Sequence, residues 1–452
     1  MASTYLTRTP SSGGNRKTFT ISAWIKRSKL SSTQIFVQAA TDGSTRSQIT
    51  LRSDDMLEFY SENGGVQKIN VRTNRVLRDT NAWYHVVLAV DTTQATASNR
   101  VKIYINGTQE TSLHTAVYGD QNYDTQFNHT VAHTIGRRDA YSDQYFDGLM
   151  SHFHIIDNTA YAASNFGSTD GTTGEWNINT QPSVTYGTNG FFVLKDTNSG
   201  TDQSTNTNNL TVNGTLTATK DNPSNVFATI NPLLGADVIG STVNYYNGNT
   251  RVDDPSGSAS GINPNFISTL GMPSSGKWYC ELKPNSFSTS SGHSIGIYRT
   301  KGSTDDTGLG NLEGNGAKIR YIYADTSIYI IKYGTNDQTG LTSISSGDIV
   351  GMALDLDNGT LQYYVNGSAR HNPITGINSA NDGYDYFFHA GLESSSSGRY
   401  GRYYWNFGNG YFATTAVDSN SGNGYQDSNS QGKFQYQPPT NFLALCTKNL
   451  NI

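Results

Sequence analysis

Paired carboxylates are the first residues in this sequence whose spacing could support chemistry. Hydrolysis of a glycosidic bond with retention needs two carboxyl groups about 5 Å apart. The nearest acidic pairs are Glu58 and Glu62 in EFYSE, and Asp355 and Asp357 in DLD. Glu58 and Glu62 would lie on one side of a strand, as a catalytic pair or as solvated carboxylates at its end. The two aspartates flank a predicted hairpin, and we expect them to cap its turn.

Two histidines could contribute to a metal site. His152 and His154 in SHFHI would share one face of a strand, with Phe153 directed into the core. Imidazoles on one face can bind zinc, but the sequence around them shows no third ligand. A solvated strand face is the alternative. The sequence has no phosphate-binding loop of the G-x-x-x-x-G-K-[ST] type and no Cys-x-x-Cys motif.

Tyrosine accounts for 28 of the aromatic residues and gathers with arginine in two places. Tyr, Ser, Gly and Asn make adaptable binding surfaces, and sugars suit them, because sugar C–H groups stack on rings while hydroxyls bond polar groups. The alternatives are coverage of a sandwich edge, contact with a neighbouring protein, and Arg–Tyr packing in an oligomer. The predicted binding residues are Arg137, Arg138, Tyr141, Asp143 and Tyr145 in RRDAYSDQY, and Arg399, Tyr400, Arg402, Tyr403 and Tyr404 in GRYGRYY.

The composition excludes some partners. The 452 residues carry a formal net charge of −5 without a cationic block, so we expect no binding of nucleic acid. No run reaches the ~18 apolar residues of a membrane span, and the N-terminal residues lack the apolar core of a signal peptide. Cys280 and Cys446 are too few for a disulfide framework; we expect two buried thiols, with a bridge between them left open.

The elements that must position these side chains are strands. Short alternating runs are separated by Gly, Asn, Asp and Ser clusters, which predicts an all-β protein. In residues 18–28, Phe19, Ile21, Ala23 and Ile25 alternate with mostly polar residues. Only residues 161–168 suggest a helical turn.

One hairpin pattern occurs twice. VKIYING at 101–107 and LQYYVNG at 361–367 each follow a strand-like run that ends in Asp. Asn-Gly supplies the positive φ angles of a tight hairpin turn. The repetition predicts two sandwiches of one type: residues 1–168, then a polar linker or surface-hugging segment at 169–234, then residues 235–452 with a C-terminal extension.

The order of these motifs resembles known families. TFTISAWIKRS, WYHVVLAVD, VKIYING and FDGLMSHFHIID resemble a laminin-G or pentraxin-like domain of the concanavalin A-like superfamily. GKWYCEL, GDIVGMALDLDNGTLQYYVNG and NFG resemble a SPRY domain, a related sandwich. The resemblance implies two concanavalin A-like (jelly-roll) β-sandwiches joined by a polar extended segment.

The first resemblance also bears on individual residues. It implies a structural position for His85 in WYHVV. Laminin-G-like domains often bind Ca²⁺ through carboxylates in a loop, and Asp139, Asp143 and Asp147 are the best acidic candidates for such a site. A polar loop without an ion is the alternative, and no other cofactor is expected. The second resemblance implies that loops such as residues 394–404 bind a partner.

The whole arrangement is similar to that of surface proteins of tailed bacteriophages. It implies a non-enzymatic tail fibre or spike component of the virion, made in the host cytoplasm, released by lysis and adhering to host-surface glycans. Its partners would be other virion proteins and copies of itself, and the resemblance implies a trimer. The alternatives are a capsid decoration or scaffold protein that binds only virion subunits, and a glycan-degrading spike that uses Glu58 and Glu62.

Overall fold

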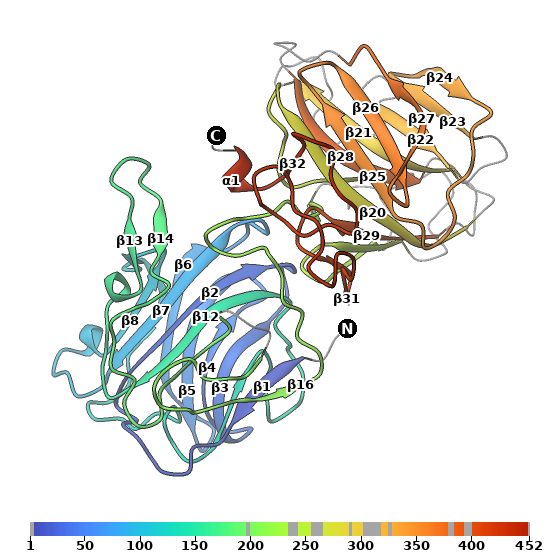
Figure 1. Cartoon of the computed structure of the whole chain (residues 1–452). Coiled ribbons are helices and arrows are strands. Elements are labelled where there is room, and N and C mark those ends of the chain that lie inside the picture. The colour runs from blue at the N-terminus through green and yellow to red at the C-terminus, as the bar shows by residue number, and fades with distance from the viewer. Residues whose placement is uncertain are drawn as a thin grey trace. The chain divides into compact units, whose positions relative to one another are not determined.

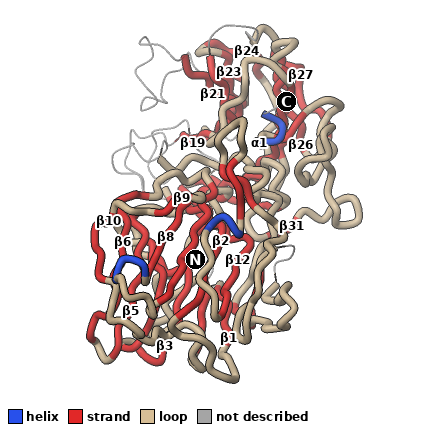
Figure 2. Tube along the Cα trace, turned by 90° about the vertical axis from the view of Figure 1, so that its left-hand side faces the viewer, coloured by secondary structure: helices blue, strands red, loops and turns tan. Residues whose placement is uncertain are grey.

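The computed structural model describes residues 4–195, 199–233, 243–254, 265–288, 292–301, 318–323, 328–377, 384–392 and 400–450. The chain divides into two compact units, Met1–Ala218 and Thr219–Ile452, each built from antiparallel sheets (Figure 1). Strands dominate both units, and the helices are short turns (Figure 2). The prediction of an all-β protein with two β-sandwich domains is confirmed. In the described ranges no helix has the length and apolar character that crossing a lipid bilayer requires.

The first unit is a sandwich of two sheets. The eight-stranded sheet has the order β10 (Leu113–Val117), β6 (Val66–Val76), β5 (Met56–Asn63), β4 (Thr45–Leu51), β3 (Gln34–Asp42), β11 (Ala132–Ile135), β1 (Tyr5–Arg8), β16 (Thr211–Asn213). The six-stranded sheet has the order β15 (Phe191–Val193), β12 (Gly148–Asp157), β2 (Thr18–Arg27), β7 (Trp83–Asp91), β8 (Val101–Ile105), β9 (Thr108–Gln109). Outside them lie the pair β13 (Gly167–Thr169) and β14 (Trp176–Ile178), and two 3₁₀ turns, η1 (Ala97–Asn99) and η2 (Ala163–Asn165).

The core of the first unit lies between these sheets. Phe19, Ile21, Ala23 and Ile25 of β2 all point into it, as their alternation predicts. The eight-stranded sheet supplies residues such as Ile49, Leu51, Leu57, Phe59, Ile69 and Val71. Burying these side chains is the main source of stability for such a sandwich.

The outer face of the six-stranded sheet is also covered. Residues 158–190 pass over it and bring Phe166, Trp176 and Tyr186 against β7 and β12. His85 of β7 is 1 % exposed beneath this cover, which agrees with its expected structural position. The helical turn expected in residues 161–168 is η2, within this segment.

The second unit repeats the plan. One sheet has the order β17 (Asn244–Tyr246), β18 (Arg251–Asp254), β29 (Gly401–Asn406), β20 (Lys277–Phe287), β25 (Val350–Asp355), β26 (Thr360–Val365), β27 (Ser368–Ile374). The other has the order β19 (Asn265–Ile267), β28 (Tyr384–Leu392), β21 (His293–Lys301), β22 (Lys318–Ile322), β23 (Tyr329–Lys332), β24 (Thr335–Thr339). The remaining elements are the pair β30 (Tyr411–Phe412) and β31 (Thr415–Ala416), β32 (Leu443–Ala444) beside β20, and the single helical turn α1 (Thr447–Leu450).

Strand order shows that the two units share one topology. The order β12-β2-β7-β8-β9 in the first matches β29-β20-β25-β26-β27 in the second. The order β6-β5-β4-β3-β11-β1 likewise matches β24-β23-β22-β21-β28-β19. The two copies of the Asn-Gly hairpin therefore occupy equivalent positions, joining β8 to β9 and β26 to β27.

The polar stretch at 169–234 is divided between the units. β15 pairs with β12 and β16 pairs with β1, so its first part packs on the first sandwich. Residues 219–233 belong to the second unit. This is surface-hugging behaviour, and the apolar run GFFVLK supplies the anchoring strand β15.

The C-terminal segment contributes one short strand to the second unit. Within residues 440–449 only Leu443–Ala444 is a strand, and it pairs in parallel with Trp278 and Tyr279 of β20. β29 pairs with β20 only from Glu281 onward, which leaves the earlier backbone of β20 open for β32. Cys280 and Cys446 are both buried and free, so the bridge that the sequence left open is not formed.

Candidate functional site

One face of the eight-stranded sheet in the first unit is polar and lies opposite the core. Strand alternation places Arg46, Gln48 and Thr50 of β4 on this face, because Ile49 and Leu51 fill the core. Neighbouring β5 presents Glu58, Tyr60 and Glu62 in the same way. We call this surface the polar face.

Side chains on the polar face are aligned in rows across the strands. Gln38, Gln48, Tyr60 and Asn70 follow one another in register over β3, β4, β5 and β6. Gln38 Nε2 donates to Gln48 Oε1 at 2.8 Å, and Gln48 Nε2 donates to Thr50 Oγ1 at 3.1 Å. Such bonds fix the side chains before any ligand arrives.

A charged group lies beside this row. Arg46 forms an ion pair with Glu62 at 2.8 Å, and Tyr60 Oη donates to the other oxygen of the same carboxylate at 2.8 Å. Burial, together with the Glu62 charge, raises the pKa of Tyr60 to about 12, so its hydroxyl keeps its proton at neutral pH. The Glu62 carboxylate is therefore held in one orientation by two hydrogen-bond donors, Arg46 and Tyr60.

Glu58 lies on the same face but not next to Glu62. It pairs with Arg52 at 3.1 Å, and Tyr60 lies between the two glutamates along β5. Four residues of strand span about 13 Å, well beyond the 5–5.5 Å that a retaining pair of carboxylates needs. The structure thus holds the two glutamates in separate ion pairs.

The loop 137–145 packs against one side of the polar face. The backbone N–H of Asp139 donates to Gln38 Oε1 at 2.8 Å, which ties the loop to the row of amides. Arg138 bonds Asp143 through both backbone and side chain, and its guanidinium lies 4.3 Å from the Tyr141 ring centre. Tyr141 is 59 % exposed, so the loop presents an aromatic ring to solvent.

Arg137 and Tyr145 form the inner part of this loop. The Arg137 guanidinium stacks 3.6 Å from the Tyr5 ring centre and pairs with Asp139 at 2.7 Å. Tyr145 also packs against Tyr5, with ring centres 6.4 Å apart. The structure thus brings the five predicted binding residues of the first cluster into one folded loop.

The three aspartates proposed for calcium are placed differently. Asp139 and Asp143 each pair with an arginine, which neutralises them. Burial raises the pKa of Asp147, against the effect of Lys29. Across the described ranges, no group of three or more His, Cys, Asp or Glu is arranged to hold a metal ion. The two histidines of β12 belong to no such group. The His154 ring stacks on that of Phe192, with ring centres 4.0 Å apart, and His154 bonds Tyr186 Oη at 2.9 Å.

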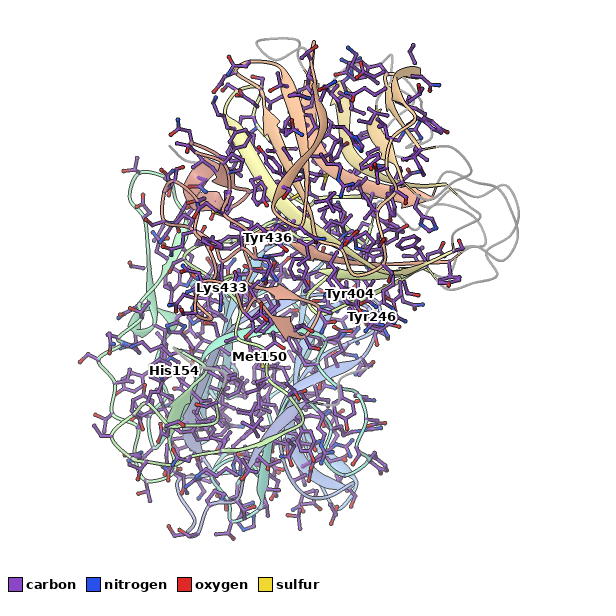
Figure 3. All side chains as sticks on the ribbon, turned by 45° about the vertical axis from the view of Figure 1, so that its right-hand side comes forward. Met150, His154, Tyr246, Tyr404, Lys433 and Tyr436 are labelled. Atoms are coloured by element: carbon purple, nitrogen blue, oxygen red, sulfur yellow. The ribbon has the colours of Figure 1, made fainter. Side chains whose placement is uncertain are left out.

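The second predicted cluster is split by strand alternation. Tyr404 of β29 lies on the outer side, near Tyr246 (Figure 3). The Arg251 guanidinium lies 5.8 Å from the ring centre of Tyr404 and 4.7 Å from that of Tyr246. Arg402 pairs with Asp253 at 3.1 Å on that side. Tyr400 is 38 % exposed at the start of the strand, and Arg399 lies outside the described residues.

Tyr403 is a correction to the predicted cluster. Its side chain is fully buried in the core, where Tyr403 Oη bonds His293 Nδ1 at 2.7 Å. It shares a face with Trp405, two residues along the strand, and the large apolar Trp405 marks that face as the core side. Tyr403 is therefore part of the packing and not of a binding surface.

Sequence reasoning missed the row of amides. The pattern TRSQITLRS does show polar residues at alternate positions, but one-sided strands commonly look like this. What distinguishes the polar face is that Gln38 and Thr50 are at most 1 % exposed although they face away from the core. That property depends on the covering loop and cannot be read from one strand.

Comparison with known families gives the class of the first domain. Residues 2–165 match the family described as the concanavalin A-like lectin/glucanases superfamily, of the Laminin_G_3 type. The first unit therefore contains a concanavalin A-like lectin/glucanase domain of laminin G type. No curated protein matches the chain by sequence.

Some solved structures are similar to the chain at low sequence identity. The SPRY domain of human HERC1 has 16 % identity and a TM-score of 0.28, over 37 % of this chain and 93 % of that one. A pentraxin of Limulus polyphemus has 15 % identity and a TM-score of 0.29, over 43 % and 89 %. Domain 4 of the arabinanase AbnA from Geobacillus stearothermophilus, solved with arabinotriose, has 19 % identity and a TM-score of 0.26, over 35 % and 68 %. These similarities are too low to transfer a ligand.

Proposed function

We propose that this protein is a non-enzymatic glycan-binding protein whose first domain binds carbohydrate on the polar face and the loop 137–145. The observation that carries this proposal is the row of hydrogen-bonded amide, phenol and carboxylate groups on a sheet face that does not serve the core. The laminin G type of the first domain agrees with carbohydrate binding.

The chemistry of the face suits a sugar. Sugar hydroxyls donate and accept hydrogen bonds, and the partly exposed Arg52, Tyr60 and Asn70 offer guanidinium, phenol and amide groups above the buried part of the row, which holds them in place. The exposed ring of Tyr141 supplies an apolar surface at its edge. Because the charges on the face are paired with one another, it would favour neutral polar ligands over strongly charged ones.

The absence of catalysis is part of the proposal. Glu58 and Glu62 are the acidic pair best placed by the sequence, yet each is held by its own arginine with Tyr60 between them. Incubation with polysaccharides should leave polymer length unchanged. A fall in polymer length that is abolished by Glu62→Gln would overturn this part.

The glycan proposal can be tested by binding the full chain to a glycan array. Tyr141→Ala and Gln48→Ala should each weaken the strongest signals by about tenfold, as expected for loss of one stacking or hydrogen-bonding contact. Tyr400→Ala removes a partly exposed tyrosine of the second unit and serves as the matched control. If Tyr400→Ala weakens binding and Tyr141→Ala does not, the site belongs to the second unit and the proposal is wrong.

We further propose the setting in which this binding acts, namely the surface of a tailed-bacteriophage virion, as a tail fibre or spike component that adheres to host-surface glycans. Its support is the order of sequence segments, in which a laminin-G-like domain, a polar stretch and a SPRY-like domain follow one another. Two domains on one chain, repeated in a homo-oligomer such as a trimer, would add weak contacts into firm adhesion.

Labelling purified virions with antibody against this chain tests the setting. Antibody label at the tail tip would support a fibre component. A mass of three chains for the purified protein, measured by light scattering, would support the trimer. Label spread over the capsid, with no binding to host cells, would favour the decoration role instead. Virions without label would overturn the virion proposal and leave the glycan proposal standing.

A further inference from the structure

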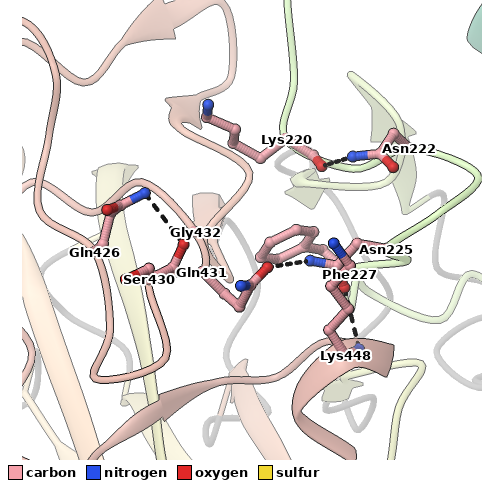
Figure 4. A pocket seen from close by; sticks show the side chains of 9 residues that line it. All are labelled: Lys220, Asn222, Asn225, Phe227, Gln426, Ser430, Gln431, Gly432 and Lys448. Atoms are coloured by element: carbon pink, nitrogen blue, oxygen red, sulfur yellow. Dashed lines mark hydrogen bonds between the residues drawn. The ribbon is translucent and has the colours of Figure 1, made fainter.

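A small pocket in the second unit has no role in the proposed glycan site. It has a volume of about 160 Å³ and is lined by residues of 220–227, of 426–432 and by Lys448. Figure 4 shows Lys220 and Lys448 on opposite sides of it, with Asn225 and Gln431 between them. The C-terminal extension and the segment that enters the second unit therefore build this pocket together.

The amide groups of the pocket are held by the protein itself. Asn225 is 4 % exposed; its Nδ2 donates to Gln431 Oε1 at 3.0 Å, and its Oδ1 accepts the backbone N–H of Lys448 at 3.2 Å. Asn222 Nδ2 donates to the carbonyl of Lys220 at 2.7 Å. These bonds hold the backbone of both lysines and give the pocket a defined wall, while the two lysine side chains are exposed.

The charge in the pocket is one-sided. Its lining contains two lysines and no carboxylate. Asp221 and Asp427 lie nearby but face backbone donors of their own segments, the N–H of Phe227 at 3.4 Å and of Gln431 at 2.8 Å. Within the described ranges neither lysine ammonium forms an ion pair. Two exposed lysine side chains, both from residues that line one pocket, can turn their ammonium groups toward it and create a positive potential that attracts an anion.

We propose that this pocket binds the carboxylate of an acidic sugar residue, such as a hexuronic acid, between Lys220 and Lys448. The volume is about five times that of a water molecule in the liquid, which is more than a lone oxyanion needs. The remaining walls offer amides and Phe227 to the ring and its hydroxyls. This inference rests on the glycan-binding proposal for the choice of ligand but uses a different domain and different residues.

The test measures binding of D-glucuronate to the full chain by calorimetry and by ligand-observed NMR. D-glucose and the methyl ester of D-glucuronate, which lack the negative charge, are the matched ligands. The variants are Lys220→Ala with Lys448→Ala, the charge-retaining Lys220→Arg with Lys448→Arg, and Lys102→Ala on β8 of the first unit as a control. Circular dichroism checks that each variant is folded.

We expect D-glucuronate to bind, its neutral analogues to bind at least tenfold more weakly, and the double alanine variant to lose at least tenfold in affinity. The arginine variant and Lys102→Ala should retain most of the affinity. Equal binding by the wild type and the double alanine variant, or no binding of D-glucuronate at all, would overturn the inference. If sulfate at the same concentration displaces D-glucuronate, the pocket binds a simple anion and not specifically a sugar acid. That result would also overturn the inference.

The two proposals fail in different ways. Loss of neutral-glycan binding in Tyr141→Ala with intact D-glucuronate binding leaves the pocket standing on its own. Neutral-glycan binding without D-glucuronate binding refutes the pocket alone.

Discussion

Trp176 Nε1 donates a hydrogen bond to Nδ1 of His85 at 2.9 Å, although the two residues are 91 positions apart in the chain. The bond fixes the neutral tautomer of His85, whose Nε2–H can then donate to Ser22 Oγ at 2.9 Å. The Trp176 ring also lies against Gly107, where a Cβ atom would come within 2.3 Å of it. One side chain thus links the covering segment to β7 and to the turn of the repeated hairpin.

Trp176→Phe should destabilise the first unit. Phenylalanine keeps a ring over Gly107 but leaves Nδ1 of His85 buried without its donor, at a cost of about 1–3 kcal/mol. Urea unfolding followed by circular dichroism measures this change, and Trp176→Ala should cost more because the ring is lost as well. Wild-type stability in Trp176→Phe would show that the ring alone matters.

The two Asn-Gly turns should respond alike to substitution. Asn106 has φ 46° and its side chain accepts the backbone N–H of His85 at 2.8 Å, while Asn366 has φ 51° and accepts that of Ile349 at 2.9 Å. Asn106→Ala and Asn366→Ala should each cost about 1–3 kcal/mol, because alanine loses the acceptor and resists a positive φ.

Hydrogen exchange read by mass spectrometry can assign each loss to its own unit. Asn106→Gly and Asn366→Gly are the controls, since glycine tolerates the backbone angle and loses only the acceptor. If the glycine and alanine variants behave identically, backbone strain contributes nothing and this explanation is wrong.

Glu281 should make the stability of the second unit depend on pH. Its buried carboxylate accepts the backbone N–H groups of Gln435 at 2.9 Å and Tyr436 at 2.8 Å, and burial raises its pKa to about 7. The folded state therefore holds a proton that the unfolded state, with a pKa near 4.5, has released. Stability from this group is fully present below about pH 4.5 and is lost as the pH rises to about 7, by about 3 kcal/mol.

Glu281→Gln isolates this effect. The amide cannot titrate, and its NH₂ group would face a donor, so the variant should be less stable at low pH. The difference in unfolding free energy between wild type and variant should shrink as the pH rises from 4.5 to 7. A difference that stays constant or grows would contradict the raised pKa.

Gly43 should control the position of Tyr141. A Cβ atom at Gly43 would come within 2.5 Å of the Tyr141 hydroxyl, and the flexible ring can move away at little cost. Gly43→Ala should therefore weaken glycan binding nearly as much as Tyr141→Ala while leaving the unfolding temperature within about 2 °C. Gly171→Ala, where nothing lies within 4 Å, is the control. Unchanged binding in Gly43→Ala would separate Tyr141 from the site.

Much of the fold could be predicted from the sequence because it is encoded locally. The alternation of Phe19, Ile21, Ala23 and Ile25 has the period of a strand, and Asn-Gly has the backbone freedom that a hairpin turn needs. Asp355 accepts the backbone N–H of Asn358 at 2.9 Å, which confirms the expected cap for this residue, whereas Asp357 accepts the backbone N–H of the distant Gly276 at 2.7 Å. The alternation, the hairpin turn and the Asp355 cap depend on neighbours within a few residues.

Only part of the candidate site could be predicted from such local patterns. The loop 137–145 could be recognised because its Arg, Asp and Tyr residues are close in sequence, and Arg138 does bond Asp143. The row from Gln38 to Asn70 spans four strands, and its members look like ordinary polar residues of one-sided strands. Tyr403 could have been assigned to the core from its shared face with Trp405, a signal that the tyrosine-rich context obscured.

The sequence by itself determined the strands, the two hairpin turns and the division into two similar sandwiches, since these follow from periodicity and backbone preference. Only the tertiary structure decided which strand faces directed away from the core are also covered, that Trp176 reaches His85, and that Lys220 and Lys448 line one pocket. The physical reason is that burial and electrostatic environment are set by residues far away in the chain, whereas φ and ψ preferences are set by the residue itself and its neighbours.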